Sequence, residues 1–135
     1  MMNEGMEKKK CVLVVDDELA ILRFMRISLN ACGYKCICVN NGQEALKMVE
    51  AEKPDLVVLD VFMPGMNGFE VLENIRSSTS NLPVLVSSAR TSIAEKAMSL
   101  GASGFIAKPF TPDYLVKKIQ ALLPLQNSNG NALQG

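Results

Sequence analysis

The sequence predicts an α/β protein in which a parallel β-sheet of five strands carries helices on both faces. Three observations lead to this fold class. Short apolar runs, typical of strands buried on both faces, recur along the chain. Longer segments with apolar residues at helical spacing separate these runs, and helix-capping signals precede most of them. A strand and a helix that alternate five times imply right-handed crossovers and a three-layer sandwich.

Five apolar runs are the predicted strands. The run from Cys11 to Val15 is continuous rather than alternating, as expected of a strand that is buried on both faces. The runs at 55–60, 82–87 and 104–107 have the same character. The weaker run at 35–39 is expected at an edge of the sheet.

The predicted helices lie between these runs. The first has apolar residues at helical spacing from Leu22 to Cys32, and Gly33 after it suits a helix end. Residue pairs with capping-box spacing precede the next three. These pairs are Asn41 with Glu44, Asn67 with Glu70, and Ser92 with Glu95. Thr111 and Pro112 supply a cap and a first-turn proline for the fifth helix.

The composition excludes several classes of protein. The chain has 135 residues, of which 48% are hydrophobic, and it balances 14 Lys+Arg against 14 Asp+Glu. That length suits one domain, and the hydrophobic fraction is too high for a disordered chain. Zero net charge gives no electrostatic footprint for nucleic acid or an anionic membrane. Because the chain has no histidine, serine–histidine hydrolysis and histidine–zinc chemistry are excluded within it.

Cysteine usage and terminal composition predict the compartment and the boundaries. Cys11, Cys32, Cys36 and Cys38 form no C-x-x-C pair, so we expect buried free thiols. No stretch approaches the roughly 18 apolar residues that span a bilayer. We therefore expect a cytoplasmic protein that contacts no membrane. We expect a flexible lead-in at residues 1–9, one domain at 10–124, and a polar tail or truncated linker at 125–135.

Polar side chains follow four of the predicted strands. In an open parallel sheet, ligands bind outside the carboxyl ends of the strands, where the strand order reverses. We therefore expect these side chains to meet on one rim. They are Asp16, Asp17 and Glu18 after the first strand, Asp60 at the end of the third, Ser87 and Ser88 at the end of the fourth, and Lys108 after the fifth.

This combination favours phosphoryl chemistry. Three carboxylates close together repel each other, so either a cation is bound or their pKa values rise. A site with only oxygen ligands suits a hard ion such as Mg²⁺. Mg²⁺ is expected on Asp16 and Asp17, and it leaves room for a phosphoryl group. A lysine ammonium and a hydroxyl, here Lys108 and Ser88, are suited to the remaining phosphoryl oxygens. Asp60 stands alone at a central strand end and is the nucleophile candidate.

The residues in this order resemble the receiver domain of bacterial two-component response regulators. The resemblance runs from about Cys11 to Leu123. It rests on Asp16-Asp17-Glu18 after a strand, Asp60 followed by M-P-G-M-N-G, Ser88-Ala89, and G-F-I-A-K-P-F from Gly104 to Phe110. It implies a flavodoxin-like, doubly wound (βα)5 sandwich whose parallel strands have the order 2-1-3-4-5.

The resemblance also implies roles for single residues. Asp60 is the phosphoacceptor. Mg²⁺ is held by Asp17, by Asp60 and by the backbone carbonyl of Phe62, while Asp16 acts through water. Ser88 and Lys108 complete the catalytic set, and the peptide bond into Pro109 is cis.

Function follows from the resemblance in the same way. The phosphoryl donor is the phosphohistidine of a sensor histidine kinase or of a phosphotransfer protein. Phosphorylation draws Ser88 inward and moves Phe105, which remodels the face of the fourth helix, fifth strand and fifth helix. The domain is then a self-phosphorylating acceptor rather than an enzyme, with an unknown downstream partner and no direct binding of nucleic acid.

Three alternatives stay open at this point. A nucleotide- or flavin-binding domain would need a glycine-rich turn where this chain has acids. A phosphatase of the haloacid dehalogenase type would carry a D-x-D motif after its first strand and usually a cap domain. The third alternative is an interaction module with the receiver fold that works without phosphorylation.

Overall fold

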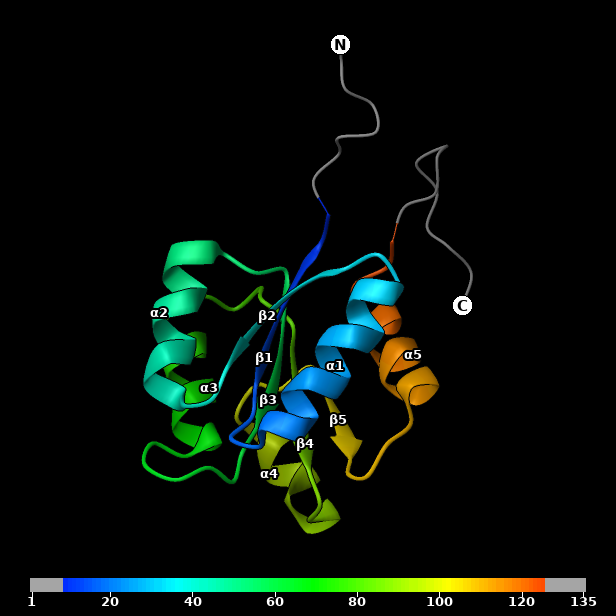
Figure 1. The fold of residues 1–135 in the computed structure, drawn as a ribbon. Coiled ribbons are helices and arrows are strands. Elements are labelled where there is room, and N and C mark those ends of the chain that lie inside the picture. The colour runs from blue at the N-terminus through cyan, green and yellow to red at the C-terminus, as the bar shows by residue number, and fades with distance from the viewer. Residues whose placement is uncertain (1–8, 126–135) are drawn as a thin grey trace.

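A computed structural model describes residues 9–125 as a five-stranded sheet between two layers of helices (Figure 1). Residues 1–8 of the predicted lead-in and 126–135 of the predicted tail lie outside the described residues. Among the helices of the described part, none combines the length and the apolar character that crossing a membrane requires.

All five predicted strands form, and all neighbouring strands are parallel. Their order is β2-β1-β3-β4-β5, which confirms the predicted order 2-1-3-4-5. The strands are β1 Cys11–Val15, β2 Lys35–Val39, β3 Leu56–Asp60, β4 Val84–Ser88 and β5 Gly104–Ala107. Every residue of β1, β3 and β4 is buried, whereas the weaker run forms the edge strand β2 as expected.

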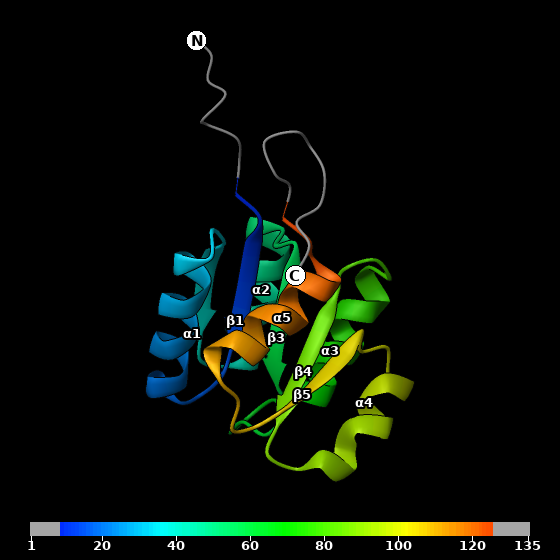
Figure 2. The same ribbon diagram turned by 90° about the vertical axis from the view of Figure 1, so that its right-hand side faces the viewer.

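The helices divide between the two faces of the sheet (Figures 1 and 2). They are α1 Leu19–Ala31, α2 Gly42–Glu52, α3 Gly68–Ser78, α4 Ala94–Ser99 and α5 Pro112–Leu122, with a short 3-10 turn, η2, at Thr91–Ile93. Helices α1 and α5 pack on one face through apolar residues such as Met25 and Ile119. Helices α2, α3 and α4 pack on the other, through residues such as Ala45, Leu72 and Ala97.

The capping predictions are confirmed at α3 and α5, confirmed in part at α2, and wrong at the fourth helix. Asn67 and Glu70 form the full capping box, and the Thr111 hydroxyl accepts from the Tyr114 amide. At α2 the Asn41 side chain accepts from the Glu44 amide at 2.8 Å, but the Glu44 carboxylate lies 3.6 Å from Lys47 Nζ.

Ser92 does not cap the fourth helix. It lies inside the 3-10 turn η2, and α4 begins at Ala94 without a side-chain cap. A cap residue needs an extended backbone, which Ser92 lacks because its own backbone already turns. The cysteine prediction is confirmed in part, since none of the four cysteines forms a disulfide. Cys11 is buried, and the other three are half-buried.

Gly68 lets helix α3 start against the end of strand β3. A Cβ atom at this position would lie 2.3 Å from Val61 Cα and 2.5 Å from the Asp60 carbonyl oxygen. Both neighbours are backbone atoms, which cannot rotate away. The Gly68 amide also donates to the Val61 carbonyl at 3.0 Å. A residue without a side chain is therefore required here, directly behind Asp60.

Gly68→Ala should lower the free energy of unfolding by about 2–3 kcal/mol, because backbone must shift to admit the methyl group. Gly65→Ala is the control: no atom lies within 4 Å of its Cβ position, but its φ of +81° strains a side chain. That strain costs about 1 kcal/mol. Urea unfolding of both variants measures the difference. A Gly68→Ala variant as stable as the parent would contradict the close approach.

Tyr34 ties the end of α1 to the end of α5. Its ring is fully buried, and its hydroxyl donates to the Leu123 carbonyl at 2.9 Å. Burial, with a smaller contribution from Cys32, raises the pKa of Tyr34 to about 12, so the hydroxyl keeps its proton at neutral pH. This one bond joins residues 89 positions apart in the chain.

Tyr34→Phe should lower the free energy of unfolding by about 1–2 kcal/mol, because it leaves a buried carbonyl without its donor. Tyr114→Phe removes the same hydroxyl from an exposed ring and should change stability by less than about 0.5 kcal/mol. Thermal and urea unfolding of the two variants test this. Equal effects would show that the Tyr34 hydrogen bond contributes nothing specific.

Candidate functional site

The predicted rim residues meet at the carboxyl ends of the strands. Asp16 and Asp17 follow β1, while Asp60 and Ser88 are the last residues of β3 and β4. Lys108 follows β5 directly. The chain runs from β1 outward to β2 and then returns to β3 on the other side of β1. The carboxyl ends of β1 and β3 therefore flank the point where the strand order reverses, which is where open α/β sheets bind ligands.

Backbone hydrogen bonds fix the rim on both sides. The Asp16 amide donates to the Val39 carbonyl at the end of β2, at 3.2 Å. The Lys108 amide donates to the Ser88 carbonyl at 2.9 Å. One oxygen of each buried carboxylate is also held locally. Asp16 Oδ1 accepts from the Glu18 amide at 3.0 Å, and Asp60 Oδ1 accepts from the Phe62 amide at 3.2 Å.

The Lys108 ammonium joins the carboxylates of the rim. Its Nζ lies 2.7 Å from Asp16 Oδ2 and 3.5 Å from Asp60 Oδ2, with Glu18 Oε1 at 3.9 Å. Asp16 is 1% exposed and Asp60 5%, so two of these carboxylates are almost withdrawn from water. Buried carboxylates are costly unless a cation and hydrogen bonds compensate them. Lys108 supplies part of that compensation.

The residues present fit a magnesium ion. Asp16, Asp17 and Asp60 each offer one carboxylate oxygen, and these oxygens all lie within 4.8 Å of one another. Asp17 is exposed and so provides an open side toward solvent. Mg²⁺ prefers one or two carboxylates, several waters and phosphate oxygens over a closed protein cage. This open set, with oxygen ligands alone, matches that preference.

The charges of the rim act on each other. Burial raises the pKa of Asp60; the Phe62 amide and Lys108 oppose that rise, while the charges of Asp16 and Asp17 add to it. Burial alone would lower the pKa of Lys108, but its hydrogen bond to Asp16 and the nearby carboxylates outweigh burial and hold that pKa above its ordinary value. Lys108 therefore stays charged, and the rim carries excess negative charge that a further cation would relieve.

The two serines at the end of β4 differ in their surroundings. Ser88 Oγ accepts from the Arg90 amide at 2.9 Å, which keeps its own hydrogen available for another acceptor. Ser87 Oγ is the one buried side-chain oxygen or nitrogen in the described part of the chain without a hydrogen-bond partner. Register places Ser87 beside Asp60 on β3 and Ser88 beside Ala107 on β5.

The remaining predicted site residues border the rim. The Phe62 ring is 43% exposed and lies under the Arg90 guanidinium, whose Cζ is 4.6 Å from the ring centroid. Phe105 is half-buried against the core on the α2–α4 side. The peptide bond between Lys108 and Pro109 is cis, as predicted. Metal ligation by the Phe62 carbonyl and switching by Phe105 stay predictions.

Sequence reasoning missed an apolar cavity beside Lys108. The cavity measures about 540 Å³, and it is bordered by Ile21 and Phe24 of α1 and by Pro109 and Phe110 after β5. The Phe24 and Phe110 rings lie 6.0 Å apart. The sequence shows the K-P-F motif at residues 108–110, but the contact of this motif with α1 arises only in the folded protein. This cavity gives the rim an apolar border on the α1 side.

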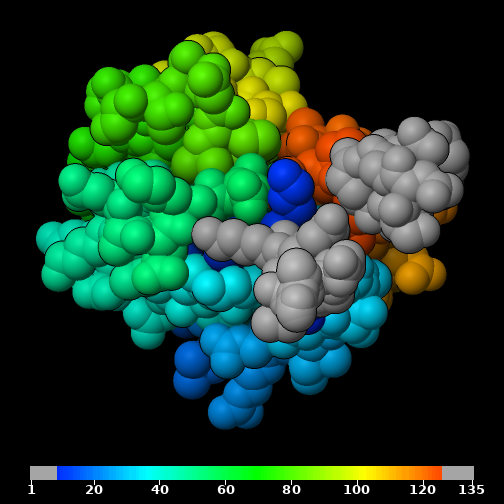
Figure 3. Space-filling model, turned by 90° about the horizontal axis from the view of Figure 1, so that it is seen from above, coloured from blue at the N-terminus to red at the C-terminus, as the bar shows by residue number. Residues whose placement is uncertain are grey.

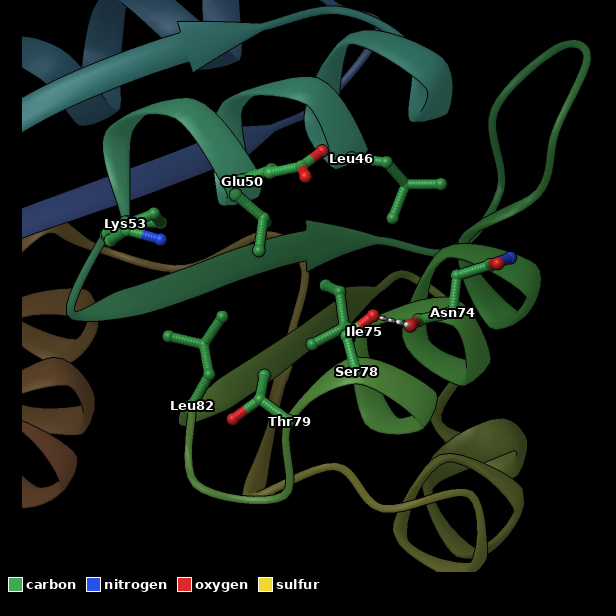
Figure 4. A pocket seen from close by; sticks show the side chains of 10 residues that line it. Leu46, Glu50, Lys53, Asn74, Ile75, Ser78, Thr79 and Leu82 are labelled. Carbon is green, nitrogen blue, oxygen red and sulfur yellow. Dashed lines mark hydrogen bonds between the residues drawn. The ribbon is translucent and has the colours of Figure 1, made fainter.

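A second cavity of about 540 Å³ lies far from this chemistry, between α2 and α3 (Figure 4). Its wall includes Lys53 and Pro54, which precede β3, and Thr79 and Leu82, which precede β4. It therefore opens at the amino ends of the strands, opposite the rim. Figure 3 views the molecule from that end, where α2 and α3 lie side by side. None of the predicted site residues lines this cavity.

Comparisons with known proteins agree on one family. The family model of the response regulator receiver domain matches residues 12–120. Response regulator MprA of Mycobacterium leprae is 43% identical over 114 residues, which are 83% of this chain and 50% of MprA. The alkaline phosphatase synthesis transcriptional regulatory protein PhoP of Bacillus subtilis is 39% identical over 116 residues, which are 84% of this chain and 48% of PhoP.

A solved structure agrees as well. The chemotaxis response regulator CheY4 of Vibrio cholerae superposes with a TM-score of 0.80 at 33% identity, covering 86% of this chain and 100% of that chain. This chain spans about half the length of the curated relatives it matches. The predicted absence of nucleic-acid binding has no support, since one relative is named a transcriptional regulatory protein. From Val12 to Gln120, the chain belongs to the response regulator receiver domain family of two-component signalling.

Proposed function

We propose that Asp60 accepts a phosphoryl group, with Mg²⁺, from the phosphohistidine of a sensor histidine kinase or phosphotransfer protein. The observation that carries this proposal is the buried Asp60 carboxylate, placed 3.5 Å from the Lys108 ammonium and within reach of two further carboxylates. Receiver domains are generally not enzymes in the usual sense, and the proposed reaction is one turnover on the domain itself. We place this reaction in the cytoplasm.

The proposed step is attack by a carboxylate oxygen of Asp60 on phosphorus. The bond between phosphorus and the donor imidazole nitrogen breaks, and its electron pair stays on that nitrogen, which takes up a proton. Asp60 then carries an acyl phosphate. When bound, Mg²⁺ neutralises charge on the phosphoryl oxygens. Asp17, Asp60 and the Phe62 carbonyl would hold it, with Asp16 acting through water.

Lys108 and Ser88 would receive the transferred group. Lysine has three donors, of which one is used by Asp16 at 2.7 Å. Asp60 Oδ2, 3.5 Å from the same nitrogen, could take a second, which leaves one donor for a phosphoryl oxygen. The Ser88 hydroxyl, whose lone pair is used by the Arg90 amide, can donate its hydrogen to another phosphoryl oxygen. Movement of Ser88 toward that oxygen would then favour a more buried Phe105 and alter the α4-β5-α5 face.

The apolar cavity beside Lys108 is our proposed contact for the phosphodonor protein. A donor that brings phosphohistidine to Asp60 must touch the surface around the rim. The cavity formed with Ile21, Phe24 and Phe110 adjoins Lys108 and is mostly apolar. Apolar surface next to a reactive site is typical of a protein-docking surface. One earlier alternative is compatible with membership of this family, namely an interaction module that works without phosphorylation. The following test distinguishes it from a phosphoacceptor.

Acetyl phosphate with Mg²⁺ should add one phosphoryl group to the parent chain and none to Asp60→Asn, because the amide is no nucleophile. Intact-mass spectrometry measures the gain. Asp113→Asn removes an exposed carboxylate from the first turn of α5 and should label like the parent. EDTA should abolish labelling in the parent and in Asp113→Asn. Labelling of Asp60→Asn would overturn the assignment of Asp60. An unlabelled parent, beside a labelled control receiver, would favour the phosphorylation-independent module.

Asp60→Asn should stabilise the metal-free protein near neutral pH. The pKa of Asp60 is raised in the folded state, so its contribution to stability is most favourable below the ordinary value of 3.8. That contribution is lost as pH rises through the folded-state pKa. The stability gap between variant and parent should therefore be largest at about pH 7.5 and should narrow toward about pH 4.

Urea unfolding in EDTA across that pH range measures the gap. Asp113→Asn is the matched control, because its carboxylate is exposed and its effect should stay within about 0.5 kcal/mol. An Asp60→Asn variant that is less stable than the parent near neutral pH would contradict the charge balance described for the rim.

A further inference from the structure

Two cysteines lie side by side on the edge strand β2, apart from the phosphoryl chemistry. Cys36 and Cys38 are two positions apart and so share one face of the strand, with their sulfur atoms 3.7 Å apart. They pack under α1, on the α1–α5 side of the sheet. The Cys38 thiol donates to the Leu22 carbonyl oxygen of that helix, with 3.7 Å between Sγ and the oxygen. Figure 1 shows β2 as the outermost strand, next to α1.

Cys38 lines a cavity with two arginines. The cavity measures about 440 Å³ and opens between α1 and the carboxyl end of β2. Its charged lining consists of Arg23 and Arg26 from α1 and Glu44 from α2. Cys36 is not part of the lining. The cavity therefore presents one accessible thiol and a net positive charge, a combination suited to an anionic reagent that reacts with sulfur.

The surroundings make the two thiols unequal. The hydrogen bond between Cys36 and Cys38 is the largest influence on Cys38, and with Arg26 it outweighs burial, so the pKa of Cys38 lies below that of an ordinary thiol. The same hydrogen bond and burial raise the pKa of Cys36. Cys38 lines the cavity and has the lower pKa of the two, which makes it the candidate nucleophile.

We propose that Cys38 is a modification site that exchanges with a small anionic disulfide held by Arg23 and Arg26, and that Cys36 resolves the product. In the first step Cys38 loses to solvent the proton that it donates to the Leu22 carbonyl, and the thiolate attacks one sulfur of the reagent. A mixed disulfide forms, and the second half of the reagent leaves as a thiolate. In the second step Cys36 loses its proton and attacks Cys38 Sγ, which releases the first half. Two cysteine thiols are oxidised, and one reagent disulfide is reduced to two thiols.

The strand geometry allows the second step and limits the lifetime of its product. The sulfur atoms must move from 3.7 Å to about 2.05 Å, the length of a disulfide bond. β2 is an edge strand, with β1 as its only partner in the described sheet, so its backbone has freedom to adjust. A bond across adjacent same-face positions of an extended strand is strained and is easily reduced. The site is therefore suited to reversible modification.

The test exposes the whole chain, under native conditions, to glutathione disulfide, each half of which carries two carboxylates. Intact mass and peptide mapping follow the products. We expect first a glutathione adduct on Cys38. The adduct is then released, and the protein is two hydrogens lighter than at the start because Cys36 and Cys38 have formed a disulfide. Cys36→Ser should accumulate the adduct. Cys38→Ser should react at least about tenfold more slowly, since the remaining thiols lack its activation. Cys32→Ser is the control and should behave like the parent.

The role of the arginines is tested separately. Arg26→Gln should slow adduct formation roughly tenfold, because a smaller fraction of Cys38 is thiolate. Arg90→Gln changes an exposed arginine outside the cavity and should have no effect. Cystamine is a cationic disulfide and serves as the comparison reagent. The rate of adduct formation with each disulfide is divided by its rate with the urea-unfolded chain. We expect this ratio to be higher for glutathione disulfide than for cystamine. Circular dichroism of every variant checks that the fold persists.

The proposal fails if the adduct maps to Cys32 or Cys11, or if Cys38→Ser reacts as fast as the parent. It also fails if the anionic and cationic disulfides show equal normalised rates. None of these readouts involves phosphorylation of Asp60. Failure here is therefore distinguishable from failure of the proposed function.

Discussion

The acidic rim depends on one ion pair, between Lys108 and Asp16. Two almost fully buried carboxylates, Asp16 and Asp60, lie near a third at the end of a central pair of strands. Without a nearby cation, their repulsion and desolvation would oppose folding of the rim. The Lys108 ammonium, 2.7 Å from Asp16 and 3.5 Å from Asp60, lowers that cost. It leaves negative charge uncompensated, which a bound cation would relieve.

The rest of the fold brings that pair together and keeps it rigid. Lys108 and Asp16 are 92 residues apart, and they meet because β1 and β5 end at the same edge of one parallel sheet. Backbone hydrogen bonds from Asp16 to Val39 and from Lys108 to Ser88 hold both sides of the rim. Behind Asp60, the close approach at Gly68 sets where α3 starts. Local placement of reactive groups thus follows from long-range pairing of strands.

At the thiol pair on β2, as at the rim, a cationic side chain lies near an acidic group and favours its ionised form. The Arg26 guanidinium lowers the pKa of Cys38, as the ammonium of Lys108 opposes the rise in the pKa of Asp60. The two places are structural neighbours, because Val39, which follows Cys38, accepts the hydrogen bond from the Asp16 amide. Their chemistry differs in kind: hard oxygen ligands gather at the rim, while polarisable sulfur lies under α1.

Sequence pattern alone determined the class of fold, the five strands, most of the helix caps and the residue types at each strand end. Apolar periodicity and capping involve residues close together in the chain, so they can be recognised in the amino-acid sequence. The sequence pattern predicted the wrong structure at Ser92, where a 3-10 turn takes the place of the expected cap. Such a turn depends on how α4 packs rather than on the preference of one residue. Only the tertiary structure decided the distances: which oxygen faces Lys108, that Phe24 meets Phe110, and that Cys38 shares a cavity with Arg26. These contacts join residues that are far apart in the chain. Their distances are set by how whole helices and strands pack together, which a local sequence pattern does not determine.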